Sequence, residues 1–155
     1  MLATTVAIMG STGSIGTQTL EIIQEHPDEF EVVALGAAKS LELLVEQAIK
    51  YKPQVVAISD SALEKELRQK LPSHIDVISG PDALANASSV SDVVINGVVG
   101  FAGLPITIAA LKAGKRLGLA NKESLIAAGP LIQNFRATKG AELIPVDSEH
   151  CAIHQ

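Results

Sequence analysis

Three glycines at every third position, Gly10, Gly13 and Gly16, lie between a β-branched run and a stretch of helical periodicity. Glycine permits a tight turn and a close approach of the backbone to a ligand. The amino end of a helix offers free N–H groups and a positive dipole end to a phosphate. The spacing GxxGxxG is related to the dinucleotide fingerprint GxGxxG, and it lacks the Gly-Lys-Ser/Thr of a Walker A loop. A ligand-free glycine turn is the alternative, but its place between strand and helix favours nucleotide binding.

A short segment after the second apolar run bears on the choice between NAD and NADP. Enzymes that use NAD usually carry Asp or Glu near this point, where the carboxylate binds the ribose 2′-hydroxyl. This chain has Lys39 and Ser40 there and no acid between Gly36 and Ser40. A lysine and a hydroxyl attract a 2′-phosphate, which a carboxylate would repel. We therefore expect NADP rather than NAD, the alternative being a solvated Lys39 and a Ser40 that only caps the next helix.

The cluster Asn121-Lys122-Glu123-Ser124 follows another apolar run and begins a helical stretch. A polar turn with glutamate near the start of a helix is ordinary capping chemistry. Its position at the end of a strand is what favours a functional interpretation.

Asp147 and Glu149 form a pair of carboxylates in the segment Asp147-Ser148-Glu149-His150. In extended backbone, residues i and i+2 point to the same side. Two hard oxygen ligands at a strand end suit Mg²⁺ or Mn²⁺, which keep waters and bind substrate oxygens directly. Two solvated acids beside a capping histidine are the alternative, and from the residues alone the two interpretations are equally supported.

Short apolar runs alternate with stretches of helical period along the chain. We expect strands at 4–9, 31–36, 54–58, 76–79, 92–96, 115–120 and 141–146. We expect helices at 14–25, 41–49, 61–71, 81–86, 104–113 and 122–136, the last disturbed at Gly129-Pro130. Continuous apolar strands that alternate with helices predict a doubly wound α/β fold with a parallel sheet covered on both faces. All the polar clusters then lie at the carboxyl ends of strands, where such sheets bind ligands.

Composition excludes several classes of protein. The 155 residues are 47% hydrophobic and only 19% charged, which excludes intrinsic disorder. The net charge of −5 argues against nucleic acid as a partner. The single cysteine indicates a reducing compartment, and apolar runs are too short to span a membrane. Because a strand-like run begins within a few residues of Met1, we expect no targeting segment, no membrane partner and a cytoplasmic location.

Three motifs resemble one family, 1-deoxy-D-xylulose 5-phosphate reductoisomerase of the non-mevalonate isoprenoid pathway. They are GSTGSIG at 10–16, LANKESL at 119–125 and PVDSEH at 145–150, in the order and spacing of that family. The resemblance implies an enzyme that converts 1-deoxy-D-xylulose 5-phosphate to 2-C-methyl-D-erythritol 4-phosphate with NADPH and Mg²⁺, Mn²⁺ or Co²⁺. It also implies a Rossmann-type NADPH-binding domain at 1–146 and the start of a catalytic domain at 147–155.

The resemblance also implies roles for individual residues. The expected NADPH contacts are Thr12, Gly13, Ser14, Ile15, Lys39, Ser40, Asn121 and Glu123. The expected contacts with the sugar phosphate are Lys122, Ser148 and Glu149. Asp147 and Glu149 resemble two of the metal ligands and, with Lys122, are the expected catalytic residues.

The family continues beyond the point where this chain stops, at Gln155, into a part that carries a third carboxylate ligand. We therefore expect an amino-terminal portion that is inactive alone, from an enzyme that forms a homodimer. Two other interpretations stay open. One is another NADP-dependent Rossmann dehydrogenase, for instance one acting on a semialdehyde, with Cys151 beside His150 as its nucleophile. The other is a non-catalytic dinucleotide-binding module of sensor type, which would leave Asp147 and Glu149 without a role.

Overall fold

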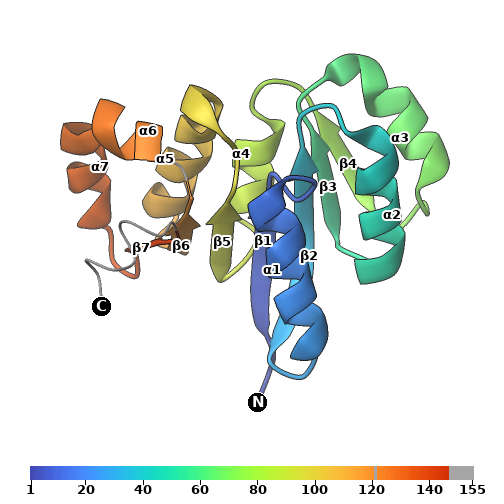
Figure 1. Cartoon of the computed structure of the whole chain (residues 1–155), viewed down its shortest axis with the longest axis horizontal. Helices are drawn as coiled ribbons and strands as arrows, with labels where there is room; N and C mark the ends of the chain where they lie inside the picture. Colours follow the sequence, from blue (N-terminus) through green and yellow to red (C-terminus); the bar gives the residue numbers. More distant parts are fainter. Residues whose placement is uncertain (121, 147–155) are drawn as a thin grey trace.

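The centre of the fold is a parallel β-sheet. In the computed structural model, which describes residues 1–120 and 122–146, the sheet has seven strands in the order β4-β3-β2-β1-β5-β6-β7 (Figure 1). Their bounds are β1 Thr4–Met9, β2 Phe30–Ala37, β3 Val55–Ile58, β4 Asp76–Ser79, β5 Val93–Asn96, β6 Arg116–Leu119 and β7 Glu142–Pro145. Each neighbouring pair is parallel. The predicted doubly wound α/β fold is confirmed.

Helices cover both faces of this sheet. The helices α1 (Ser14–Glu25), α2 (Leu41–Tyr51) and α3 (Glu64–Lys70) contribute to one apolar core. The helices α4 (Ala83–Ser88), α5 (Leu104–Lys112) and α7 (Gly129–Arg136) contribute to the other, with α6 (Lys122–Ala127) packed at its margin. Short 3₁₀ turns, η1 (Ser61–Leu63) and η2 (Gly100–Gly103), precede α3 and α5. Among the described helices, none is long and apolar enough to cross a membrane.

Strand β1 shows why the apolar runs are continuous rather than alternating. Val6 and Ile8 enter the core under α1–α3, while Ala7 and Met9 enter the core under α4, α5 and α7. All four side chains are buried. A strand that is covered on both faces has no solvent-facing position, so polar residues are absent from its centre.

The face of the sheet under α4 carries small residues. Ala34 and Ala57 lie there, and a Cβ placed on Gly36 would be 2.8 Å from Met9 Sδ and 2.9 Å from Leu84 Cγ. These distances are shorter than van der Waals contact, so a side chain at this position would force Met9 and Leu84 to shift. The small side chains let α4 lie close against β1, β2 and β3.

Several predicted boundaries shift by a few residues. The helix expected at 61–71 begins instead as η1, in which the Leu63 N–H donates to the Asp60 carbonyl at 3.1 Å. The Asp60 carboxylate caps this turn by accepting from the Ala62 N–H at 3.0 Å. The helix expected at 81–86 is Ala83–Ser88. The disturbance expected at Gly129-Pro130 is confirmed, since α6 ends at Ala127 and α7 begins at Gly129.

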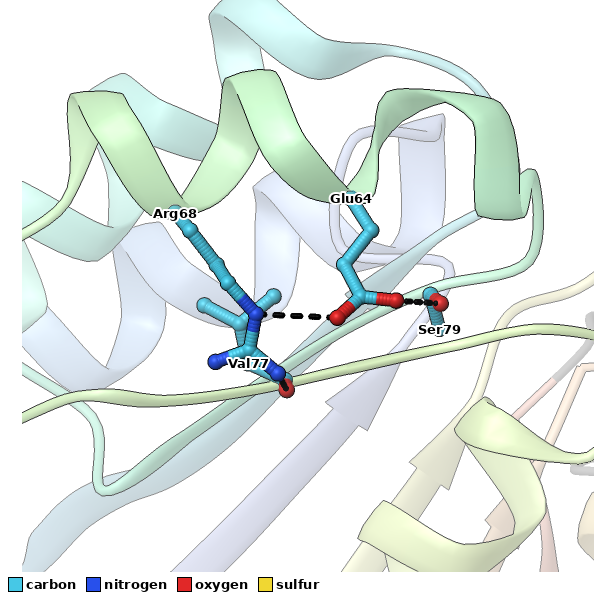
Figure 2. A network of polar contacts seen from close by, with 4 residues as sticks. All are labelled: Glu64, Arg68, Val77 and Ser79. Carbon is cyan, nitrogen blue, oxygen red and sulfur yellow. Dashed lines mark hydrogen bonds and ion pairs between the residues drawn. The ribbon is translucent and has the colours of Figure 1, made fainter.

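A polar network joins α3 to the edge strand β4 (Figure 2). Arg68 Nη2 donates to the Val77 carbonyl at 2.7 Å, and Arg68 Nε donates to Glu64 Oε1 at 2.9 Å. Ser79 Oγ donates to the other carboxylate oxygen of Glu64. The hydrogen bond from Ser79, followed by that from Arg68, holds the pKa of Glu64 below its ordinary value.

We expect Glu64→Gln to lower stability at neutral pH and to do so less as the solution becomes acidic. A carboxylate whose pKa is lowered by folding stabilises the fold above its unfolded pKa, about 4.3, and stops doing so as the pH falls through the lower folded value. Urea denaturation from pH 7 to pH 3 measures this difference, with exposed Glu46→Gln on α2 as the control. If the difference in the free energy of unfolding between Glu64→Gln and the unmodified protein stayed constant over this range, the expectation would be contradicted.

Candidate functional site

The candidate site lies where the direction of winding of the sheet reverses. From β1 the chain builds outward through β2, β3 and β4, and it then returns to place β5 against the other side of β1. The helices that follow β1 and β5, α1 and α5, therefore lie on opposite faces of the sheet, and such switch points are where doubly wound sheets bind ligands. A cavity of about 340 Å³ lies here. It is lined by Gly10, Thr12, Gly13, Ala38, Ser40, Ser59, Pro81, Leu84, Ala85, Gly97, Val98, Val99, Ala102, Pro105 and Ile106.

The three positions after β1 are glycine for different structural reasons. Gly10 has a positive φ of 81°, and a Cβ there would be 2.9 Å from the Gly97 carbonyl carbon. A Cβ on Gly16 would be 2.3 Å from the Gly10 oxygen. The fold therefore requires both glycines. Gly13 differs, because its Cβ would be 3.4 Å from the nearest atom, which is ordinary contact. Gly13 lines the cavity, so its missing side chain keeps space open for a ligand.

The amino end of α1 is open to an anion. Gly13 is the N-cap, and within the described chain no side chain caps this helix and no acidic residue lies in its first turn. Thr17 closes the first turn, since its N–H donates to the Gly13 carbonyl at 2.9 Å and its hydroxyl donates to the same oxygen at 3.0 Å. The first N–H groups of a helix have no partner inside the helix, so they can bind a phosphate at this end.

The Ser40 hydroxyl, which follows β2, is not used to cap the next helix. Ser40 is the N-cap of α2, but its side chain makes no capping hydrogen bond. Ser40 thus occupies the cap position expected from the sequence, but the capping hydrogen bond from its side chain is not formed. The reason is local, because a tight turn at Ser40 (ψ 72°) lets the Leu41 N–H donate to the Lys39 carbonyl at 2.8 Å. Ser40 lines the cavity, and Lys39 beside it is exposed.

The structure brings some of the predicted contact residues together and separates others. Thr12, Gly13 and Ser40, from two different strand ends, line one cavity. Ser14 is exposed at the start of α1. Ile15 packs instead toward the β5 turn, since a Cβ on Gly97 would be 3.4 Å from Ile15 Cβ.

The remaining predicted residues lie away from the cavity or outside the described part of the chain. Lys122 and Glu123 are exposed on α6, which follows β6, and neither lines the cavity. Asn121, Asp147, Ser148 and Glu149 lie outside the described residues. Within 1–120 and 122–146, no group of three or more His, Cys, Asp or Glu side chains is placed to hold a metal ion. The metal site expected at Asp147 and Glu149 stays a prediction.

Two walls of the cavity were not predicted as contacts. One is the α4 wall, formed by Pro81, Leu84 and Ala85, and the other includes Val98 and Val99 after β5. Both are mainly apolar and suit the flat faces of rings. The glycines at 97, 100 and 103 signal the second wall, because they follow a strand as the first motif does. The short helix at 83–88 gives no comparable signal.

Asn96 fixes the turn after β5. Its side chain is fully buried at the end of the strand. Its amide nitrogen donates to the Gly103 carbonyl at 2.8 Å and to Thr107 Oγ1 at 3.0 Å. Its oxygen accepts from the Val98 N–H at 3.3 Å. One side chain thus holds both ends of the turn that forms a cavity wall.

We expect Gly16→Ala and Gly13→Ala to differ sharply in stability. At Gly16 the new methyl group would overlap backbone atoms, so we expect the free energy of unfolding to fall by roughly 1–3 kcal/mol. At Gly13 the methyl group would meet only ordinary contact, so the change should stay within about 1 kcal/mol. Urea denaturation of the two variants measures this, and equal losses would contradict the geometry.

Comparisons with known proteins identify the family of this chain. The family model described as 1-deoxy-D-xylulose 5-phosphate reductoisomerase matches residues 6–129. The enzyme of that name from Synechococcus sp. (strain CC9902) is 48% identical over 97% of this chain and 39% of its own length. The one from Prochlorococcus marinus (strain MIT 9313) is 49% identical over 96% of this chain and 39% of its own length. The chain thus spans about 39% of the length of these relatives.

Solved structures show the same fold. The Zymomonas mobilis reductoisomerase in complex with NADPH superposes with a TM-score of 0.91 at 37% identity, over 96% of this chain and 40% of that one. A reductoisomerase in complex with NADPH, fosmidomycin and magnesium gives 0.90 at 38% identity, over 95% and 37%. A homoserine dehydrogenase from Thiobacillus denitrificans, at 17% identity and 0.55 over 91% and 28%, shares the fold alone. With the family model matching most of its length, the chain belongs to the 1-deoxy-D-xylulose 5-phosphate reductoisomerase family.

Proposed function

We propose that this chain is the NADPH-binding part of a reductoisomerase that converts 1-deoxy-D-xylulose 5-phosphate to 2-C-methyl-D-erythritol 4-phosphate. The observation that carries the proposal is the cavity at the switch point, which joins the glycine turn after β1 to Ser40 at the end of β2. The family membership supports the reaction, and the relative solved with NADPH supports the cofactor. The sugar phosphate substrate, a homodimeric assembly and domains at 1–146 and 147–155 belong to the same proposal.

The residues in and beside the cavity suit NADPH in their chemistry. The open amino end of α1 and the side-chain-free Gly13 suit the pyrophosphate. Lys39 and Ser40 suit a 2′-phosphate through a charge-assisted contact and a hydroxyl donor. The two apolar walls suit the planar rings. When bound, NADPH supplies the hydride, and the residues of this chain bind and orient it.

The cluster after β6 and the segment after β7 would serve the substrate and the metal. Lys122 is exposed at the start of α6, where its ammonium group can bind phosphate or hydroxyl oxygens of a sugar phosphate. Asp147 and Glu149 follow β7 in the sequence and supply two carboxylates for Mg²⁺, Mn²⁺ or Co²⁺. When bound, the metal supplies Lewis acidity and a template for the substrate oxygens.

The first experiment tests the cofactor. We expect the chain to bind NADPH more tightly than NADH by about 10- to 100-fold, because a charge-assisted contact contributes about 1.5–3 kcal/mol. Lys39→Asp should erode or reverse this preference. Calorimetric titration of both cofactors measures it, and Lys65→Asp, the same charge change on exposed α3, is the matched control. Equal curves for NADPH and NADH on the unmodified chain would rule out the assigned 2′-phosphate contact.

The second experiment tests the metal. Mg²⁺ and Mn²⁺ favour six oxygen ligands, and two carboxylates from this chain supply only part of that set. We therefore expect weak binding of Mn²⁺ and no turnover by these 155 residues. Asp147→Asn and Glu149→Gln should weaken Mn²⁺ binding further and leave NADPH affinity unchanged, because the glycine turn follows a different strand.

The matched control is Asp76→Asn, an exposed carboxylate on the edge strand β4. It should leave Mn²⁺ affinity unchanged in a calorimetric titration. If Glu149→Gln bound Mn²⁺ as well as the unmodified chain does, the assignment of Asp147 and Glu149 to a metal site would be wrong.

A further inference from the structure

We propose that Gln47 of α2 is a positioning residue for the phosphate-binding turn. Its side chain holds the Ser11 peptide and thereby sets the spacing between the two parts of the cavity that face phosphates. The inference rests on the proposed cofactor site and adds to it a residue that lies outside the cavity wall.

The contact is direct and buried. Gln47 lies about two helical turns after Ser40 and is 6% exposed. Its Nε2 donates to the Ser11 carbonyl at 2.8 Å. Ser11 is fully buried, and its N–H donates to the Gly36 carbonyl of β2 at 2.9 Å. The Ser11 residue is therefore held on both sides by one continuous segment, β2 followed by α2.

This segment also carries the residues proposed to face the 2′-phosphate. Ser40 begins α2 and lines the cavity, with Lys39 beside it. Thr12 and Gly13, which directly follow Ser11, line the cavity from the other side. The hydrogen bond from Gln47 thus ties the glycine turn to α2, the helix that begins beside the proposed 2′-phosphate contacts. A ligand that contacts both parts depends on this spacing, whereas a ligand that contacts only the end of β2 does not.

The polar atoms around this contact indicate that its main effect is not on stability. Gln47 Oε1 and Ser11 Oγ are buried without a hydrogen-bond partner among the described residues. An unpaired buried acceptor costs free energy of a size that offsets the gain from one hydrogen bond. Replacing Gln47 by an apolar side chain of similar volume removes the bond and the unpaired Oε1. It also takes the Gln47 donor away from the buried Ser11 carbonyl, so one unpaired acceptor replaces another and the net cost is about that of one hydrogen bond. Such a variant should stay folded while the glycine turn loses its support.

The first test compares two ligands on Gln47→Met. We expect NADPH, followed by its fluorescence, to bind about 5- to 10-fold more weakly than to the unmodified chain, as the loss of one hydrogen bond allows. Adenosine 2′-monophosphate, measured by displacement of NADPH, should keep its affinity within about twofold. Leu67→Ala is the structural control, because Leu67 is buried in the core beneath α3 and its loss destabilises without touching the turn. It should leave both affinities unchanged at temperatures where it is folded.

The second test uses Gln47→Glu and the pH. A neutral carboxyl can donate to the Ser11 carbonyl, whereas an ionised one repels that oxygen. The affinity for NADP⁺, relative to that of the unmodified chain, should therefore fall as the pH rises from 5 to 8, because burial raises the pKa of a carboxyl. Glu21, Glu46, Lys50 and Tyr51 line the same groove as Gln47, and they are identical in both proteins, so their titration cancels in the ratio. The ratio for Gln47→Met should not change with pH.

The outcomes separate the inference from the function on which it rests. If the unmodified chain bound no NADPH, the proposed cofactor site would be wrong and this inference with it. If the unmodified chain bound NADPH and Gln47→Met bound it equally well, only the positioning role would be overturned. A parallel loss of affinity for NADPH and adenosine 2′-monophosphate would also overturn it, because it would indicate general damage to the fold.

Discussion

The close approach of two backbones at the switch point is the constraint on which the site depends. The turn after β1 meets the turn after β5 at Gly10 and Gly97, with no space for a side chain between them. Gly16 lets α1 begin directly over the same turn. These contacts place the amino end of α1 at the opening between the two loops, and Asn96 holds the second loop in place. The cavity therefore forms because the main chains of the turns after β1 and β5 pack closely at glycine residues.

Side-chain size on the two faces of the sheet determines the rest of the site. The core under α1, α2 and α3 is built from larger residues such as Ile8 and Leu35, whereas the strands under α4 present mainly alanine and glycine. Because α4 can lie close to the sheet, its first turn reaches the carboxyl ends of the strands and forms a cavity wall. The apolar surface available to a ring thus depends on residues that never contact the ligand.

The sequence predicts the elements well because each carries a local pattern, such as the apolar run of β1 or the helical period after Ser40. It also predicts that the turns after β1 and β2 meet, since parallel strands end at one edge. It does not predict the α4 wall or the contact between Gln47 and Ser11, which joins residues 36 positions apart. Such pairs depend on tertiary packing, which local periodicity does not record. Nor does the sequence predict that the Ser40 side chain makes no capping hydrogen bond, which has a local reason, the tight turn centred on Ser40.

The network on β4 has a consequence for how this molecule meets others. An edge strand presents unpaired main-chain groups, which can template the addition of a strand from another molecule. Here the strand is only four residues long, and the guanidinium of Arg68 already occupies the Val77 carbonyl. Glu64 and Ser79 hold that guanidinium in place and put charge along the rim (Figure 2). This edge of the sheet is therefore a poor template for the addition of a strand from another molecule.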